Sequence, residues 1–150
     1  MKILLVEDNA RHARTAKAVL TAAGFDFIHA SDMDGAKTVL DRFKENGITH
    51  VITDLFMPQG GVGYSNSRNE PCGVAVMLCA QGRDLPAVIC TDGCHHGARY
   101  DWVTQLGRSL GWIDMADFRQ ARTREAVAPE KDWTFALELL GLVEADYSRA

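Results

Sequence analysis

The chain has 150 residues, enough for one full-sized domain that buries about two-thirds of its surface on folding. Its hydrophobic content of 47% and charged content of 24% are typical of a soluble globular protein. The net charge of -4 argues against direct nucleic-acid binding. No apolar run approaches the roughly 20 residues that span a membrane, and Glu7 ends the first apolar run too early for a signal peptide. We therefore expect a cytoplasmic protein that does not enter the membrane.

Apolar runs and amphipathic stretches alternate along the chain. Strands are predicted at Lys2–Val6, Phe25–Ala30, Ile48–Asp54, Leu85–Thr91 and Trp112–Met115. Helices are predicted at Ala10–Ala23, from the capping pair Ser31 and Asp32 to Phe43, and at Gly73–Gln81, His95–Leu110 and Trp133–Val143. The apolar run at 73–81 could also be a strand, because periodicity alone does not separate the two.

This alternation predicts an α/β fold with a doubly wound, five-stranded parallel sheet between two layers of helices. We expect residues 1–150 to form a single domain. A loop rich in Gly, Ser and Asn is predicted at about 59–71. The part of the chain from about residue 92 onward is harder to assign.

Acidic residues follow two of the predicted strands. Asp54 ends the apolar run that starts at Ile48, and Glu7 and Asp8 follow the first strand. The carboxyl ends of parallel strands form the ligand-binding edge of an open α/β sheet. Three carboxylates at that edge would repel one another unless a cation lay among them, and Mg²⁺ prefers such oxygen ligands. A simpler interpretation is that Asp8 or Asn9 caps the next helix; both interpretations can hold together.

These motifs resemble the receiver domain of two-component response regulators, which has a flavodoxin-like fold. The resemblance covers residues 1 to about 91 and is carried by Ile3–Asn9, Thr53–Pro58 and Leu85–Thr91. It implies that Asp54 is the phosphoacceptor and that Glu7, Asp8, Asp54 and the backbone carbonyl of Phe56 hold Mg²⁺. It also implies that Thr91 is the hydroxyl that turns toward the phosphoryl group.

One feature of the family is missing at the expected place. Receivers have a Lys at the end of the fifth strand, but no Lys occurs between Lys44 and Lys131, and none lies in Trp112–Met115. If the fifth strand lies there, the site lacks its cationic partner, and we expect weaker coupling between phosphorylation and shape change. The candidates to replace the Lys are Arg99, Arg108 and Arg119.

The resemblance implies a stand-alone receiver and not an enzyme. It would take a phosphoryl group from a histidine kinase or phosphotransfer protein and act through contact with a downstream protein or as a homodimer. A second interpretation is a pseudo-receiver, a binding module that phosphorylation does not switch; the missing Lys favours it. A third is a small metal-dependent phosphatase, which would need a general acid two positions after Asp54. Phe56 stands there and counts against that enzyme.

A second cluster of ligand-type residues follows the fourth predicted strand. Cys90, Cys94, His95 and His96 could hold zinc. However, Cys90 lies in an apolar strand, where free Cys commonly packs as a small hydrophobe. We expect reduced thiols, with both His residues near a solvated helix start.

Overall fold

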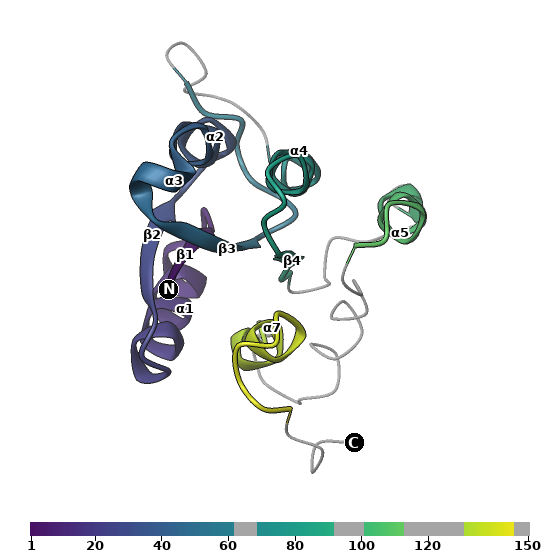
Figure 1. Cartoon of the computed structure of the whole chain (residues 1–150). Coiled ribbons are helices and arrows are strands. Elements are labelled where there is room, and N and C mark those ends of the chain that lie inside the picture. The colour runs from purple at the N-terminus through teal and green to yellow at the C-terminus, as the bar shows by residue number, and fades with distance from the viewer. Residues whose placement is uncertain (62–68, 92–100, 113–130, 146–150) are drawn as a thin grey trace.

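The computed structural model describes residues 1–61, 69–91, 101–112 and 131–145 (Figure 1). Its sheet has four parallel strands in the order β2-β1-β3-β4. These are β1 (Lys2–Val6), β2 (Asp26–Ala30), β3 (Ile48–Thr53) and β4 (Ala87–Ile89). Only Trp112 of the predicted fifth strand is described, and it does not lie in a strand. Residues 113–115 lie outside the described residues, so the predicted strand is not tested there.

The described helices follow the predicted alternation. They are α1 (Ala10–Ala22), α2 (Met33–Asp41), α3 (Phe43–Asn46), α4 (Gly73–Gln81), α5 (Asp101–Ser109) and α7 (Trp133–Leu139). The helix predicted to run to Phe43 is instead broken at Arg42, whose φ of -120° is not helical. The prediction of α4 as a helix is confirmed.

The last described helix ends earlier than predicted. α7 stops at Leu139 because Gly141 adopts a φ of 68°, which ends the helical path. The N–H of Gly141 donates to Glu138 O and that of Leu142 donates to Leu137 O, as in a Schellman cap. Residues 140–145, the last that are described, therefore lie outside the helix.

Helices cover both faces of the sheet (Figure 1). On β1, Ile3 and Leu5 face α1 and α7, whereas Leu4 and Val6 face α2 and α4. All four side chains are fully buried. This explains why β1 is continuously apolar from Ile3 to Val6 and not alternately polar, and it confirms the predicted three-layer α/β arrangement.

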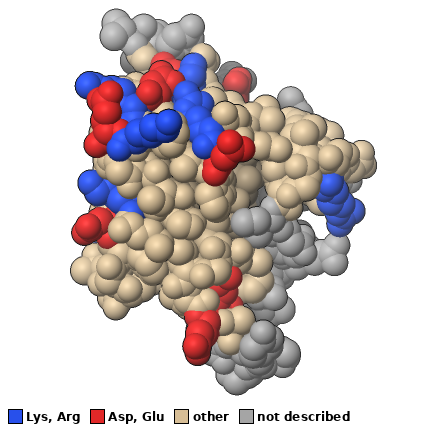
Figure 2. All heavy atoms as spheres, viewed as in Figure 1, with Lys and Arg blue, Asp and Glu red and all other residues tan. Residues whose placement is uncertain are grey.

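Charged side chains of both signs are mixed over the surface near α2 and α3, at the upper left of Figure 2. Arg42 pairs with Glu45 there, and Arg83 reaches Asp41, each pair at 2.7 Å. Such exposed pairs add little to stability. Among the described residues, no helix has the length and apolar character that crossing a bilayer would require.

Candidate phosphoacceptor and cation site

The ends of β1 and β3 bring the predicted acidic residues together. Val6 is in register with Thr53, so the residues that follow both strands emerge at the same sheet edge. The Asp54 N–H donates to Val6 O at 2.8 Å and fixes this alignment. Glu7, Asp8 and Asp54 each offer a carboxylate oxygen, and these oxygens lie within 4.8 Å of one another. The predicted convergence is confirmed.

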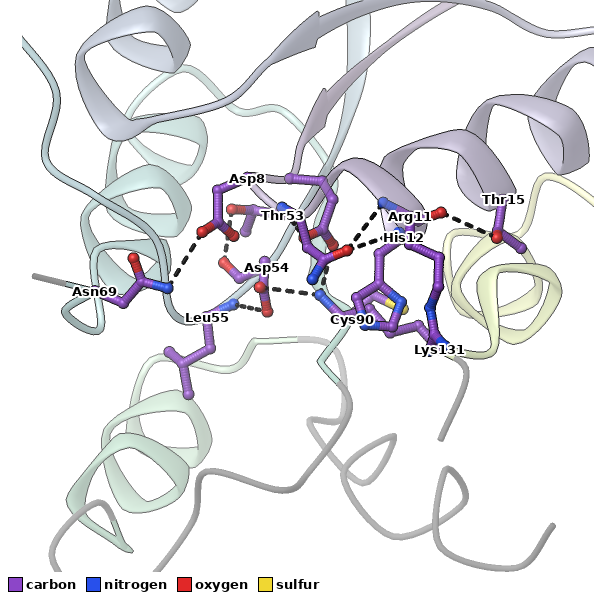
Figure 3. Close-up of polar contacts among 12 residues, drawn as sticks. Asp8, Arg11, His12, Thr15, Thr53, Asp54, Leu55, Asn69, Cys90 and Lys131 are labelled. Atoms are coloured by element: carbon purple, nitrogen blue, oxygen red, sulfur yellow. Dashed lines mark hydrogen bonds and ion pairs between the residues drawn. The ribbon is translucent and has the colours of Figure 1, made fainter. Parts of the chain in front are cut away.

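Asp54 is held by hydrogen bonds at both carboxylate oxygens. Oδ1 accepts the Leu55 N–H at 2.7 Å, and Oδ2 lies 3.0 Å from Nζ of Lys131 (Figure 3). The Thr53 hydroxyl donates to the Asp54 backbone carbonyl at 2.9 Å. The residue is only 8% exposed. Its carboxylate is therefore fixed in direction, with a cation on one side.

Glu7 is fully buried beneath this site. Its Oε1 accepts the Asn9 N–H at 3.0 Å, and its Oε2 lies 2.5 Å from Nζ of Lys131. Burial raises the pKa of Glu7 to about 7, and the charge of Asp54 adds to the rise, while Lys131 and the Asn9 N–H oppose it. A carboxylate oxygen can accept more than one bond, so Glu7 can still contribute to a cation site.

Asp8 is the most accessible of the three acids. Its Oδ2 accepts a hydrogen bond from Nδ2 of Asn69 at 3.2 Å (Figure 3). Burial and the charge of Asp54 raise the pKa of Asp8, and the bond from Asn69 opposes that rise. Asn9, and not Asp8, caps α1: its Oδ1 accepts hydrogen bonds from the N–H groups of Arg11 and His12. Asp8 is thus available to a ligand.

Lys131 supplies the positive charge of the site. Its side chain is buried, its Nζ contacts both Glu7 and Asp54, and it lies 5.6 Å from the centre of the Trp133 ring. Burial alone would lower the pKa of Lys131, but Asp54 and Glu7 together outweigh it and raise that pKa. Asp132 caps α7 by accepting the Phe135 N–H at 3.0 Å, which fixes the backbone beside Lys131.

The site therefore has a cationic partner, and the expectation that a fifth-strand Lys is missing stays untested. The fifth-strand register on which it rested falls in residues outside those described, but Lys131 reaches Asp54 from the start of α7. Arg99 and Arg119 are outside the described residues, and Arg108 is exposed on α5. Sequence reasoning missed Lys131, although its place directly before a capped apolar helix was a usable signal.

The donor set fits a divalent metal ion. Three carboxylates against one ammonium leave an excess of two negative charges when all are ionised. Hard oxygen donors at this spacing suit Mg²⁺, which keeps several waters beside one or two carboxylates. The residues present therefore agree with the predicted ion.

Comparison with known proteins bears on the fold. No protein-family model and no curated protein matches the chain. Several solved structures do match the chain. The non-phosphorylated HemR receiver domain from Leptospira biflexa matches with a TM-score of 0.58 and 22% identity, over 97% of this chain and 98% of that chain. The chain has a receiver-like fold.

Two further receiver structures agree. The bacteriophytochrome response regulator AtBRR has a TM-score of 0.57 and 21% identity, over 97% of this chain and 95% of that chain. A response regulator receiver domain protein from Clostridium thermocellum has a TM-score of 0.52 and 22% identity, over 75% and 78% of the two chains. At these identities the likeness establishes the fold, and chemistry must be argued from the side chains.

The receiver-like fold places two other predicted residues near the edge that carries the acids. Thr91 follows β4, which pairs with β3, and is 2% exposed. Within the described part of the chain, its Oγ1 has no hydrogen-bond partner. Phe56 follows Asp54 by two positions and packs its side chain into the core. The role of its carbonyl as a metal ligand stays a prediction.

The Cys and His cluster is only partly described. Cys90 is 2% exposed within the core, and its Sγ lies 3.9 Å from Asp132 O. This agrees with its interpretation as a small hydrophobe. Cys94, His95 and His96 lie outside the described residues, so the zinc interpretation is not tested.

Proposed function

We propose that this receiver-like protein accepts a phosphoryl group on Asp54 in a reaction that depends on Mg²⁺. The observation that carries the proposal is the Asp54 carboxylate itself. It is oriented by the Leu55 N–H, paired with buried Lys131, and placed beside two further acids at the ligand-binding edge. A site of this composition combines a nucleophile with positive charge for a phosphate.

The proposed donor is a phosphohistidine of a sensor kinase or phosphotransfer protein. An oxygen of Asp54 attacks phosphorus, a new O–P bond forms, and the P–N bond to the donor imidazole breaks with its electron pair leaving on nitrogen. Mg²⁺, held by Asp8, Asp54 and Glu7, would offset charge on the phosphoryl oxygens.

Lys131 serves this reaction from the other side of the carboxylate. Its ammonium is already 3.0 Å from Oδ2 of Asp54 and can follow the added negative charge onto a phosphoryl oxygen. Thr91 contributes a buried hydroxyl with no partner among the described residues, which is free to donate to the same group. Lys131, which already contacts Asp54 and Glu7, would gain a phosphoryl oxygen as a further partner on transfer, whereas Thr91 would gain a partner for a hydroxyl that has none among the described residues.

We propose that the output is contact with a downstream protein or a second copy of the chain, in the cytoplasm, and that the protein is not an enzyme. Lys131 removes the main argument for a pseudo-receiver, which was the missing cation. The phosphatase alternative needs an acid two positions after Asp54, where Phe56 is buried in the core.

The test is incubation with Mg²⁺ and acetyl phosphate, followed by intact-mass measurement. We expect a gain of one phosphoryl group that Asp54→Asn and chelator both abolish. Asp26→Asn, which alters an exposed acid on β2, should leave the gain unchanged. A native chain that binds Mg²⁺ but gains no phosphoryl group from acetyl phosphate or a phosphotransfer protein would identify a pseudo-receiver instead.

A further inference from the structure

The loop that follows Asp54 is anchored where it leaves the site. The Pro58 carbonyl accepts the N–H of Met33 at 3.1 Å, and the Gln59 carbonyl accepts the N–H of Asp34 at 2.9 Å. Both donors belong to the first turn of α2. Residues 58–59, at the start of the loop, are thus bound to the first turn of α2.

The returning strand of the loop is anchored as well. Met57 and Glu70 form an antiparallel bridge in which each N–H donates to the other's carbonyl, at 3.1 and 3.2 Å. The Cys72 N–H also donates to Glu70 O at 2.6 Å. Glu70 is therefore fixed against Met57, three residues after Asp54, and the position of the residue before Glu70 is defined.

That residue is Asn69, and it reaches the cation site. Its Nδ2 lies 3.2 Å from Oδ2 of Asp8, although the two residues are 61 positions apart in the chain. In Figure 3, Asn69 approaches Asp8 from one side of Asp54, and Lys131 lies on the other. This contact comes from the loop rich in Gly, Ser and Asn that was predicted at about 59–71.

We propose that Asn69 is a positioning residue for the cation site: its amide holds the Asp8 carboxylate in the direction that binds a divalent metal. The inference rests on the proposed Mg²⁺ site and deepens it. Outer partners that donate to a metal-ligating carboxylate fix its orientation, and their removal commonly weakens metal binding 10–100-fold. The donor fills one lone pair of Oδ2 and leaves Oδ1 of Asp8 for the ion.

The experiment measures Mg²⁺ binding without any phosphodonor, by calorimetric titration of the native chain, Asn69→Ala and Gln59→Ala. Gln59 is the matched control, because it is an amide on the opposite strand of the same loop and contributes its backbone carbonyl. We expect Asn69→Ala to raise the Mg²⁺ dissociation constant roughly tenfold, the low end of the range because Asn69 is exposed. Gln59→Ala should bind as the native chain does.

Thermal unfolding separates positioning from folding. We expect Asn69→Ala to unfold at the native temperature in chelator but to gain less from added Mg²⁺. An unchanged dissociation constant in Asn69→Ala, or an equal loss in Gln59→Ala, overturns the role of Asn69 and leaves the phosphoacceptor proposal standing. A native chain that binds Mg²⁺ but is never phosphorylated would overturn the phosphoacceptor proposal and leave the role of Asn69 standing. A native chain that binds no Mg²⁺ overturns both.

Discussion

The ammonium of Lys131 lies 2.5 Å from the carboxylate of Glu7, although 124 positions of sequence separate the two residues. The same ammonium also contacts Asp54. One buried cation therefore joins Asp54 to the acid beneath it and ties the start of α7 to the sheet edge. Charge balance at the site and docking of the last described helix depend on the same side chain.

Removing the charge of Lys131 should destabilise the protein. Lys131→Gln leaves the buried Glu7 and Asp54 without their cation, and breaking such a pair typically costs about 3 kcal/mol or more. We expect that loss in urea unfolding at pH 7 with chelator. Added Mg²⁺ should recover part of it by restoring positive charge. Lys37→Gln, at an exposed position of α2, is the control and should unfold as the native chain does.

The raised pKa of Glu7 predicts a pH dependence of stability. Between pH 4.5 and about 7, the unfolded chain has released the Glu7 proton and the folded chain still holds it. The Glu7 contribution to the free energy of unfolding therefore falls as pH rises through this window, by about 1.4 kcal/mol per pKa unit. Glu7→Gln should remove this term.

The measurement compares urea unfolding of both proteins across that pH range in chelator. The stability of Glu7→Gln relative to the native chain should rise with pH and level off above about 7. Glu45→Gln alters an exposed acid and should run parallel to the native chain. A constant difference between Glu7→Gln and the native chain would contradict the assignment of the raised pKa to Glu7.

Gly73 is required where α4 begins against the backbone of Asp54. A Cβ at this position would lie 2.1 Å from the backbone oxygen of Asp54 and 2.8 Å from Cα of Leu55. Since backbone atoms must move to make room, we expect Gly73→Ala to cost about 2 kcal/mol in chemical unfolding and to reduce phosphorylation of Asp54. At Gly82 the nearest atom to a Cβ would be 3.5 Å away. Gly82→Ala should therefore be tolerated, and equal losses in the two variants would contradict this explanation.

Two threonines near Asp54 should respond differently to removal of the hydroxyl. Thr53→Val loses the bond to the Asp54 carbonyl and should cost about 1 kcal/mol. Thr91→Val removes a buried hydroxyl that has no partner among the described residues, so stability should be retained or slightly increased. Phosphorylation with acetyl phosphate should nevertheless be impaired in Thr91→Val. A loss of stability in Thr91→Val as large as that in Thr53→Val would show that the Thr91 hydroxyl is hydrogen-bonded.

Local pattern was enough to predict the layers and the acidic cluster. Apolar runs mark the parts of the strands whose two faces are covered, and parallel strands end at the same edge of a sheet. These two rules place Glu7, Asp8 and Asp54 together without any knowledge of the rest of the chain. Helix ends were less predictable: the break at Arg42 and the stop before Gly141 depend on single backbone angles.

The sequence by itself determined the α/β arrangement and the convergence of three acids, because both follow from short apolar runs and the residues directly after them. Only the tertiary structure decided which side chains pair with those acids. Lys131 and Asn69 come from distant segments, and no local periodicity links either to the strand ends. The fold of the chain brings both residues to the acidic site. Burying carboxylates without partners is costly, so the stability of the site depends on where such partners lie.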